Sequence, residues 1–115
     1  MIFSVKGSIQ KIIDGTKTQT RRPTDRYEVG KDYAIQPGRG KKAIPEGRIK
    51  ILKKWREAPG MKSTGFFWIT AWDADAEGGY KPPDYERLYR KMYPDWFERF
   101  AYEFQFIPNE KGGKA

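Results

Sequence analysis

The sequence predicts an α+β domain, a small β-barrel or strongly bent mixed sheet with helices inserted between its strands. Segments that alternate apolar and polar residues, as strands do, are interrupted by segments with helix-start and helix-stop signals. The chain has 115 residues, which suits one domain with one hydrophobic core. Its 7 Phe, 7 Tyr and 4 Trp provide large side chains for that core, although only 37% of the residues are hydrophobic.

The first half of the chain begins with a short strand or lead-in over residues 2–5. Ser8 is a suitable N-cap for a helix whose isoleucines recur at helical spacing, and Gly15 suits the position just after its end. A polar loop is expected over residues 16–26, because Pro23 prevents helix continuation. A turn, a short apolar stretch at residues 33–35 and a loop of glycines and cations at residues 37–42 follow.

The second half contains clearer alternation. We expect strands at residues 47–55, 66–71 and 100–107, a short helix at residues 73–77 and a helix that begins at Pro82 and ends before Pro94. Ile49 and Ile51 alternate with cations in the first of these strands, and Tyr102 begins an aromatic row on one side of the last. Residues 1–108 therefore form the predicted domain, and residues 109–115 a flexible C-terminal tail.

The composition excludes several kinds of chemistry. Without cysteine, disulfides, thiolate metal sites and cysteine nucleophiles are impossible, and without histidine the commonest general base and zinc ligand are missing. Neither a phosphate-binding P-loop nor a dinucleotide-binding glycine motif is present. We therefore expect no cofactor and no metal, and any catalysis must use lysine, carboxylates, hydroxyls or arginine.

Positive charge is concentrated in the first half of the chain. The formal net charge is +8, and residues 1–56 contain 15 basic and 5 acidic side chains. This asymmetry favours a polyanionic partner, RNA first among nucleic acids, although a merely solvated surface is the alternative. The candidate nucleic-acid-binding residues are Arg21, Arg22, Arg39, Lys41, Lys42, Arg48, Lys50, Lys53 and Lys54. Because no targeting or membrane segment is found, we expect a cytoplasmic protein that does not bind membranes, with a monomer as the favoured state.

The segment 14–23 is dense in polar side chains directly after the first predicted helix. It could be a solvated connection. Alternatively, Lys17, Arg21 and Arg22 form an anion-holding pocket with Thr20 presented beside them.

This segment carries a resemblance to a known family. Gly15-x-Lys17-x-x-Thr20-x-Arg22 after a short helix resembles the signature of the ASCH domain, a member of the PUA-like barrel superfamily. The segment from Glu77 to Tyr80 is similar to the acidic, glycine and aromatic segment of that family. The final helix and strand also match, so the resemblance extends from about residue 2 to residue 107.

The resemblance implies a bent β-barrel with short helices packed around its mouth, and two kinds of activity. ASCH domains are generally inferred to bind RNA. One bacterial branch hydrolyses the amide of N(4)-acetylcytidine with a lysine, a threonine three residues later and a glutamate, and another member is described as a ribonuclease. Lys17 and Thr20 match the first two positions, and Glu77 is the best match for the third.

In such a centre Thr20 would be the nucleophile, Lys17 the base and Glu77 the group that holds or relays a proton. A lysine acts as a base only if its pKa is lowered, which burial and the neighbouring arginines favour and Glu77 opposes. The sequence leaves the balance open, and Glu77 could instead cap a helix or pair with Arg22. Trp72 and Tyr80, which flank Glu77 in the sequence, are the expected pocket walls.

Three functions follow, in order of preference. The first is an RNA-binding module with a cationic cleft, which accounts for the basic loop at residues 36–42, to which no catalytic residue of the amidohydrolase branch corresponds. The second is a hydrolase with the Lys17, Thr20 and Glu77 centre. The third is a protein-interaction domain for an acidic partner.

Overall fold

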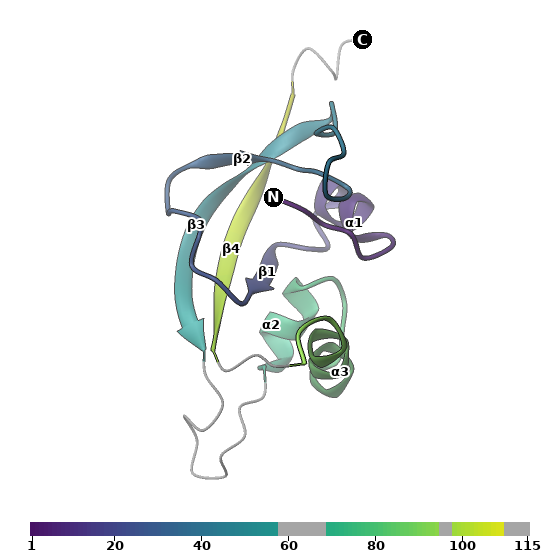
Figure 1. Cartoon of the computed structure of the whole chain (residues 1–115), viewed down its shortest axis with the longest axis vertical. Coiled ribbons are helices and arrows are strands. Elements are labelled where there is room, and N and C mark those ends of the chain that lie inside the picture. Colours follow the sequence, from purple (N-terminus) through teal and green to yellow (C-terminus); the bar gives the residue numbers. More distant parts are fainter. Residues whose placement is uncertain (58–68, 95–97, 110–115) are drawn as a thin grey trace.

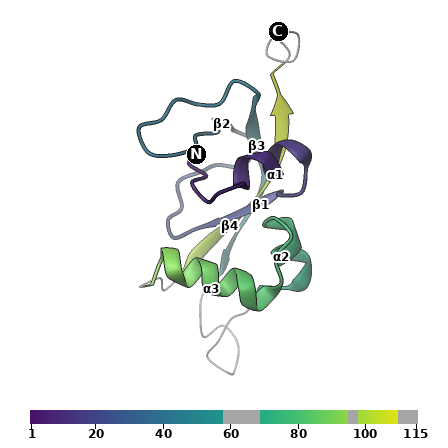
Figure 2. The same ribbon diagram turned by 90° about the vertical axis from the view of Figure 1, so that its right-hand side faces the viewer.

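A computed structural model describes residues 1–57, 69–94 and 98–109. In chain order the elements are α1 (Ser8–Asp14), β1 (Gln19–Arg22), β2 (Asp32–Ala34), β3 (Gly47–Glu57), α2 (Ala71–Ala76), α3 (Pro82–Met92) and β4 (Arg99–Pro108). The strands form one antiparallel sheet in the order β1-β4-β3-β2, and the helices lie on one side of it (Figures 1 and 2). The predicted α+β class is confirmed. Within the described residues the sheet is open.

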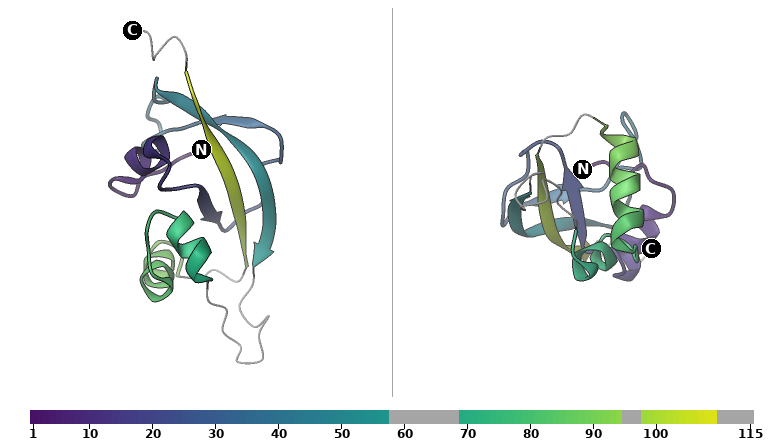
Figure 3. Two further views of the ribbon diagram at one scale, coloured as in Figure 1. Left: turned by 180° about the vertical axis from the view of Figure 1, so that it is seen from behind. Right: turned by 90° about the horizontal axis from the view of Figure 1, so that it is seen from below.

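The two long strands β3 and β4 form the centre of the sheet. Both curve strongly, as the view from behind in Figure 3 shows. Their register breaks once, because Ile51 lies opposite Phe104 whereas Lys53 lies opposite Glu103, which leaves Leu52 in a β-bulge. Side chains alternate between the faces of a sheet, so the extra residue places Glu57 on the face opposite to Ile51. Glu57 thereby shares a face with Arg99, its direct partner in the register.

Two apolar clusters hold the helices to the sheet. The first, beneath α1 and the N-terminal segment, contains Met1, Phe3, Ile12, Ile35, Ile49, Ile51, Tyr102 and Phe104. The second, between α2 and α3, contains Ile69, Ala74, Tyr85 and Tyr89. The β3 and β4 strands were predicted from their alternation, and the complete burial of Ile49 and Ile51 confirms that interpretation.

The helix ends differ slightly from the prediction. Gly7, with φ of 83°, occupies the N-cap of α1, and Ser8 is the first helical residue and makes no side-chain capping bond. Gly15 is the C-cap with φ of 87°, the left-handed conformation predicted there. Helix α3 ends before Pro94 as expected.

Two predicted segments are wrong where the structure describes them. The predicted loop at residues 16–26 contains strand β1, because its polar residues find partners in the interior instead of in water. The predicted strand at residues 66–71 lies partly outside the described residues, and its end is not a strand. Thr70 caps α2 by accepting a hydrogen bond from the Asp73 amide, and Ala71 begins that helix.

At the C-terminus, the Asn109 amide still donates to the Glu46 carbonyl at 2.8 Å, and the rest of the predicted tail lies outside the described residues. None of the helices in the described part of the chain has the length and apolar character needed to cross a membrane.

Candidate functional site

The backbone after α1 places Lys17 opposite the end of α2. Beyond the left-handed turn at Gly15, the Lys17 amide donates to the Lys11 carbonyl at 2.9 Å. The Thr18 amide donates to the Ala76 carbonyl at 2.7 Å, and the Thr18 carbonyl accepts from the Phe104 amide at 2.9 Å. This segment is therefore fixed between α2 and β4 before β1 begins.

Lys17 and Glu77 form a buried ion pair. The Lys17 ammonium donates to Glu77 Oε1 and to the Glu77 backbone carbonyl, each at 2.8 Å. Their exposed fractions are 7% and 2%. Burial lowers the pKa of Lys17 more than the attraction and hydrogen bond of Glu77 raise it, and the nearby charges of Arg22 and Arg21 lower it further. The balance that the sequence left open is thus resolved in favour of a lowered pKa.

The Lys17–Glu77 pair is the end of a longer chain of buried charges. Arg21 donates to Glu77 Oε2 at 2.9 Å and to both oxygens of Glu57 at 2.9 Å. Arg99 donates to Glu57 at 2.8 Å and to both oxygens of Glu86 at 2.8 and 2.9 Å. We call Lys17, Glu77, Arg21, Glu57, Arg99 and Glu86 the buried ion chain. Its signs alternate, so its formal charges cancel.

A small cavity, which we call the inner cavity, lies at the Lys17 end of this chain. It has a volume of about 60 Å³, room for a few water molecules. Lys17, Thr20 and Glu77 all line it, together with Arg21 and Arg22. The remaining lining is largely aromatic and apolar and includes Phe3, Tyr80, Tyr85, Leu88, Met92 and Tyr93.

Thr20 is held by its neighbour on the strand. Its hydroxyl oxygen accepts a hydrogen bond from Arg22 Nε at 3.2 Å, and its exposed fraction is 4%. A guanidinium donor favours negative charge on the oxygen that accepts from it. The same arginine lies over the Phe3 ring, 4.9 Å from its centroid, and donates to the Ile2 carbonyl.

A second, outer cavity adjoins the inner one. Its volume is about 450 Å³, and Ile2, Ser4, Arg22 and Tyr93 line both cavities. The residues that line only the outer one are Pro23, Thr24, Arg26, Tyr27 and Arg39. The two spaces therefore meet at Arg22.

Most of the predicted site residues at residues 17–22 and 77–80 come together, and two placements differ from expectation. Trp72 lies on the outside of α2 with 88% of its surface exposed and does not line the inner cavity, whereas Tyr80 does. Arg21 is 3% exposed, and its guanidinium is occupied by Glu57 and Glu77, so it is not available to a nucleic acid.

The other predicted cations divide into paired and unpaired groups. Lys54 forms an ion pair with Asp25 at 2.8 Å. Among the predicted nucleic-acid-binding cations, the exposed ones that form no ion pair with a carboxylate of the described residues are Arg39, Lys41, Lys42, Arg48, Lys50 and Lys53. The bulge at Leu52 places Lys53 on the same face of the sheet as Lys50, because their partners Glu103 and Gln105 lie two residues apart in β4.

Sequence reasoning missed Glu57, Glu86, Arg99 and the outer-cavity residue Arg26. One signal was present, since Glu86 stands directly beside Tyr85 in the predicted helix that begins at Pro82. In the sequence, Glu57, Arg99 and Arg26 cannot be distinguished from ordinary surface charges, because their neighbours in the fold lie far away along the chain. Among the described residues no cluster of three or more carboxylates could hold a metal ion.

Comparisons with known proteins were made by sequence and by structure. No family model and no curated protein matches the sequence. An ASCH domain structure from Lactobacillus crispatus has a TM-score of 0.67 at 11% identity, covering 89% of this chain and 71% of the other. The S128A mutant of an ASCH protein from Zymomonas mobilis has a TM-score of 0.59 at 17% identity, covering 94% and 71%.

A third solved structure, an Enterococcus faecalis protein of the family DUF984, has a TM-score of 0.57 at 20% identity and covers 86% of this chain and 69% of its own. These similarities are too low in sequence identity to transfer a function, but they agree on the architecture. The resemblance that the sequence motifs indicated is confirmed at the level of the fold: this chain has the fold of an ASCH domain.

Proposed function

We propose that this protein is an RNA-binding domain of the PUA-like kind, in which the open sheet corresponds to the bent barrel of that superfamily. The observation that supports this proposal best is the separation of charge between interior and surface. Glu57, Glu77 and Glu86 are buried in the neutral ion chain, so the formal net charge of +8 belongs entirely to the rest of the chain. The unpaired exposed cations between residues 39 and 53 can contact phosphates without first breaking an ion pair.

The inner and outer cavities support RNA rather than duplex DNA as the partner. The outer cavity, with Tyr27 and Tyr93 in its lining, suits an unpaired base, which can stack on aromatic rings when it is not paired with a second strand. Duplex DNA would present its bases only within grooves.

Charge reversal tests this proposal. In Lys50→Glu/Lys53→Glu and in Lys41→Glu/Lys42→Glu, affinity for a single-stranded RNA 12-mer should fall about tenfold or more, because phosphate contacts are lost and repulsion is added. Fluorescence anisotropy at fixed ionic strength measures the affinity. The matched control is Lys91→Glu, an exposed cation at the end of α3 that lines neither cavity, which should change affinity about twofold at most. Equal losses in all three variants would refute a specific cationic surface.

A hydrolase is the second candidate, favoured by the convergence of Lys17, Thr20 and Glu77 on one cavity. With N(4)-acetylcytidine, the Thr20 oxygen would attack the acetyl carbon while neutral Lys17 accepts the hydroxyl proton. The C–N bond would then break, the leaving nitrogen would take that proton back, and water would release acetate from Thr20. The lowered pKa of Lys17 increases the fraction of neutral amine, as this role requires.

Substitutions at Thr20 separate the two candidates. Thr20→Val keeps the shape of the side chain and removes the hydroxyl, so hydrolysis should stop while RNA affinity changes about twofold at most. Thr20→Ser keeps a hydroxyl and should keep measurable turnover. Release of cytidine, followed by chromatography, is the measurement. If the unmodified protein binds RNA but releases no cytidine, the hydrolase is refuted and RNA binding is the remaining candidate function.

A further inference from the structure

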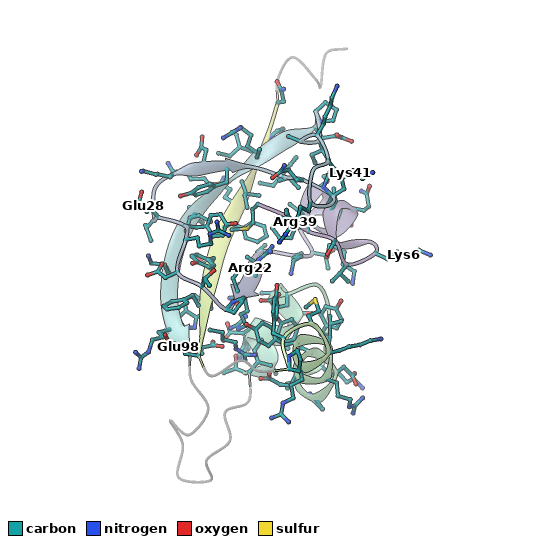
Figure 4. The ribbon with its side chains drawn as sticks, viewed as in Figure 1. Lys6, Arg22, Glu28, Arg39, Lys41 and Glu98 are labelled. Carbon is teal, nitrogen blue, oxygen red and sulfur yellow. The ribbon has the colours of Figure 1, made fainter. Side chains whose placement is uncertain are left out.

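The outer cavity gathers three arginines from different parts of the chain. Arg22 belongs to β1, Arg26 to the segment after it and Arg39 to the loop before β3. In Figure 4 the side chains of Arg22 and Arg39 lie close together in the middle of the molecule, whereas Lys6 and Lys41 extend toward its edge. The loop at residues 36–42, which the amidohydrolase motif left without a role, thus contributes to the wall of a cavity next to the candidate centre.

The charges of these arginines are not neutralised within the described part of the protein. None of the three forms an ion pair there, and no carboxylate is among the outer-cavity lining residues. Arg22 donates only to neutral oxygens, the Thr20 hydroxyl and the Ile2 carbonyl. Guanidinium groups present fixed pairs of donors that match phosphate oxygens, so several of them around one space favour an oxyanion.

The position of the outer cavity identifies what carries that anion. The two cavities share Arg22 and Tyr93, so a ligand in one lies directly beside a ligand in the other. The outer volume of about 450 Å³ accommodates a ribose with its phosphate, and the inner volume of about 60 Å³ admits only the edge of a base. We infer that Arg22, Arg26 and Arg39 bind the phosphate of a nucleotide whose base edge faces Thr20 and Lys17.

This inference rests on the proposed function and makes it more specific. The unit that the site recognises is a nucleotide with its phosphate, either free or within an RNA strand, rather than a nucleoside. Tyr27, which also lines the outer cavity, and Tyr93 provide ring surfaces for the sugar.

Titration calorimetry with cytidine, cytidine monophosphate and inorganic phosphate tests the phosphate subsite. The monophosphate should bind about tenfold or more tightly than cytidine, because a charge-assisted contact is gained. Arg39→Gln and Arg26→Gln, both at exposed positions that leave the fold intact, should each reduce that preference to about threefold or less. The matched controls Lys6→Gln and Lys91→Gln, exposed cations that do not line the outer cavity, should keep the full preference.

The possible outcomes separate this inference from the proposed function. If the protein binds RNA but binds monophosphate no better than cytidine, the subsite is refuted and the RNA-binding function stands. If monophosphate is preferred in an Arg39-dependent manner but no RNA 12-mer binds, the RNA-binding function is refuted and the subsite stands. Inorganic phosphate that binds as tightly as the monophosphate would refute a nucleotide as the source of the anion.

Discussion

At the scale of single residues, Glu77 has the most consequential position in the site. It accepts hydrogen bonds from Lys17 and Arg21, which are both buried, and it lines the inner cavity. A buried charge that loses its partner keeps its desolvation cost without the compensating attraction. The same carboxylate therefore supports the fold and shapes the candidate centre.

Replacement of Glu77 should be costly to stability. Glu77→Gln leaves Lys17 without its anionic partner and removes one of the carboxylates that pair with Arg21. The free energy of unfolding should therefore fall by about 3 kcal/mol. Urea denaturation followed by circular dichroism measures it. Glu28→Gln, which removes an exposed pair with Lys31, is the matched control and should leave the midpoint unchanged. Similar midpoints for the two variants would show that the buried pair contributes no more than a surface pair.

Glu57 makes the free energy of unfolding depend on pH in the acidic range. Burial by itself raises the pKa of Glu57, but the hydrogen bond and charge of Arg21, with the charge of Arg99, lower it further than burial raises it, to below the ordinary 4.5. The unfolded chain therefore binds a proton at a higher pH than the folded protein does. This group's contribution to stability is fully present above about pH 5 and is lost as pH falls through the lowered pKa.

The melting temperature should accordingly fall between about pH 5 and pH 3, and it should fall less steeply in Glu57→Gln, which lacks the titrating group. Differential scanning calorimetry across this range measures both slopes. Glu46→Gln, an exposed acid with no ion pair among the described residues, should keep the slope of the unmodified protein. Parallel curves for Glu57→Gln and the unmodified protein would contradict the linkage.

At the scale of secondary structure elements, the sequence predicted β3 and β4 well but missed β1. Alternating isoleucines and aromatic residues mark the two long strands directly. Strand β1 buries Gln19, Thr20 and Arg21, whose polar side chains have no apolar periodicity to reveal a strand. Their partners come from positions far along the chain, so no local pattern could show that these residues are buried.

The candidate site was likewise predictable only in part. Lys17, Thr20 and Glu77 were found through the motif, and the cavity brings them together. The expected role of Arg21 in contacting nucleic acid could not be corrected from the sequence, because the two carboxylates that accept its hydrogen bonds lie 36 and 56 residues away. The bulge at Leu52 decides which face Glu57 occupies, and one inserted residue is invisible in a periodicity argument.

Gly47 at the start of β3 provides a test at this scale. A Cβ there would lie 2.3 Å from the Ile107 carbonyl oxygen and 2.7 Å from the Phe106 ring, so the backbone of β4 would have to move. Gly47→Ala should lower the free energy of unfolding by about 2 kcal/mol or more. Gly38→Ala is the control, since its Cβ would meet only the flexible Lys41 side chain at 3.4 Å. Equal unfolding midpoints for the two variants would show that β3 and β4 accommodate the added methyl group with no loss in the free energy of unfolding.

At the scale of the whole molecule, the buried charges of the described residues cancel, so the net charge of +8 belongs to the rest of the chain. Binding to RNA should therefore depend steeply on salt. For a single strand the logarithm of the affinity falls with the logarithm of salt concentration by about 0.7 for each phosphate contacted. With four contacts, the affinity should fall about fiftyfold when the salt concentration rises fourfold.

Anisotropy titrations at several potassium chloride concentrations measure this slope. The slope should become shallower in Lys50→Gln/Lys53→Gln and remain unchanged in Lys91→Gln, because only the first variant loses predicted nucleic-acid-binding cations. Binding that does not depend on salt would refute this prediction and would show that apolar contacts, not phosphate contacts, provide the affinity for RNA.

The connection between β3 and β4 has a consequence for how such a domain can diversify. Glu57 and Arg99 are direct partners, so the chain leaves the sheet and returns to it at the same point. The described part of the segment between them contains both α2 and α3. Insertions or deletions in this segment leave the register of the sheet unchanged, while they can alter the cavity wall formed by Tyr80, Tyr85 and Tyr93. Ligand preference can thus change through the length of this one helical segment, provided that Glu77 and Glu86 still pair with the buried cations Lys17 and Arg99.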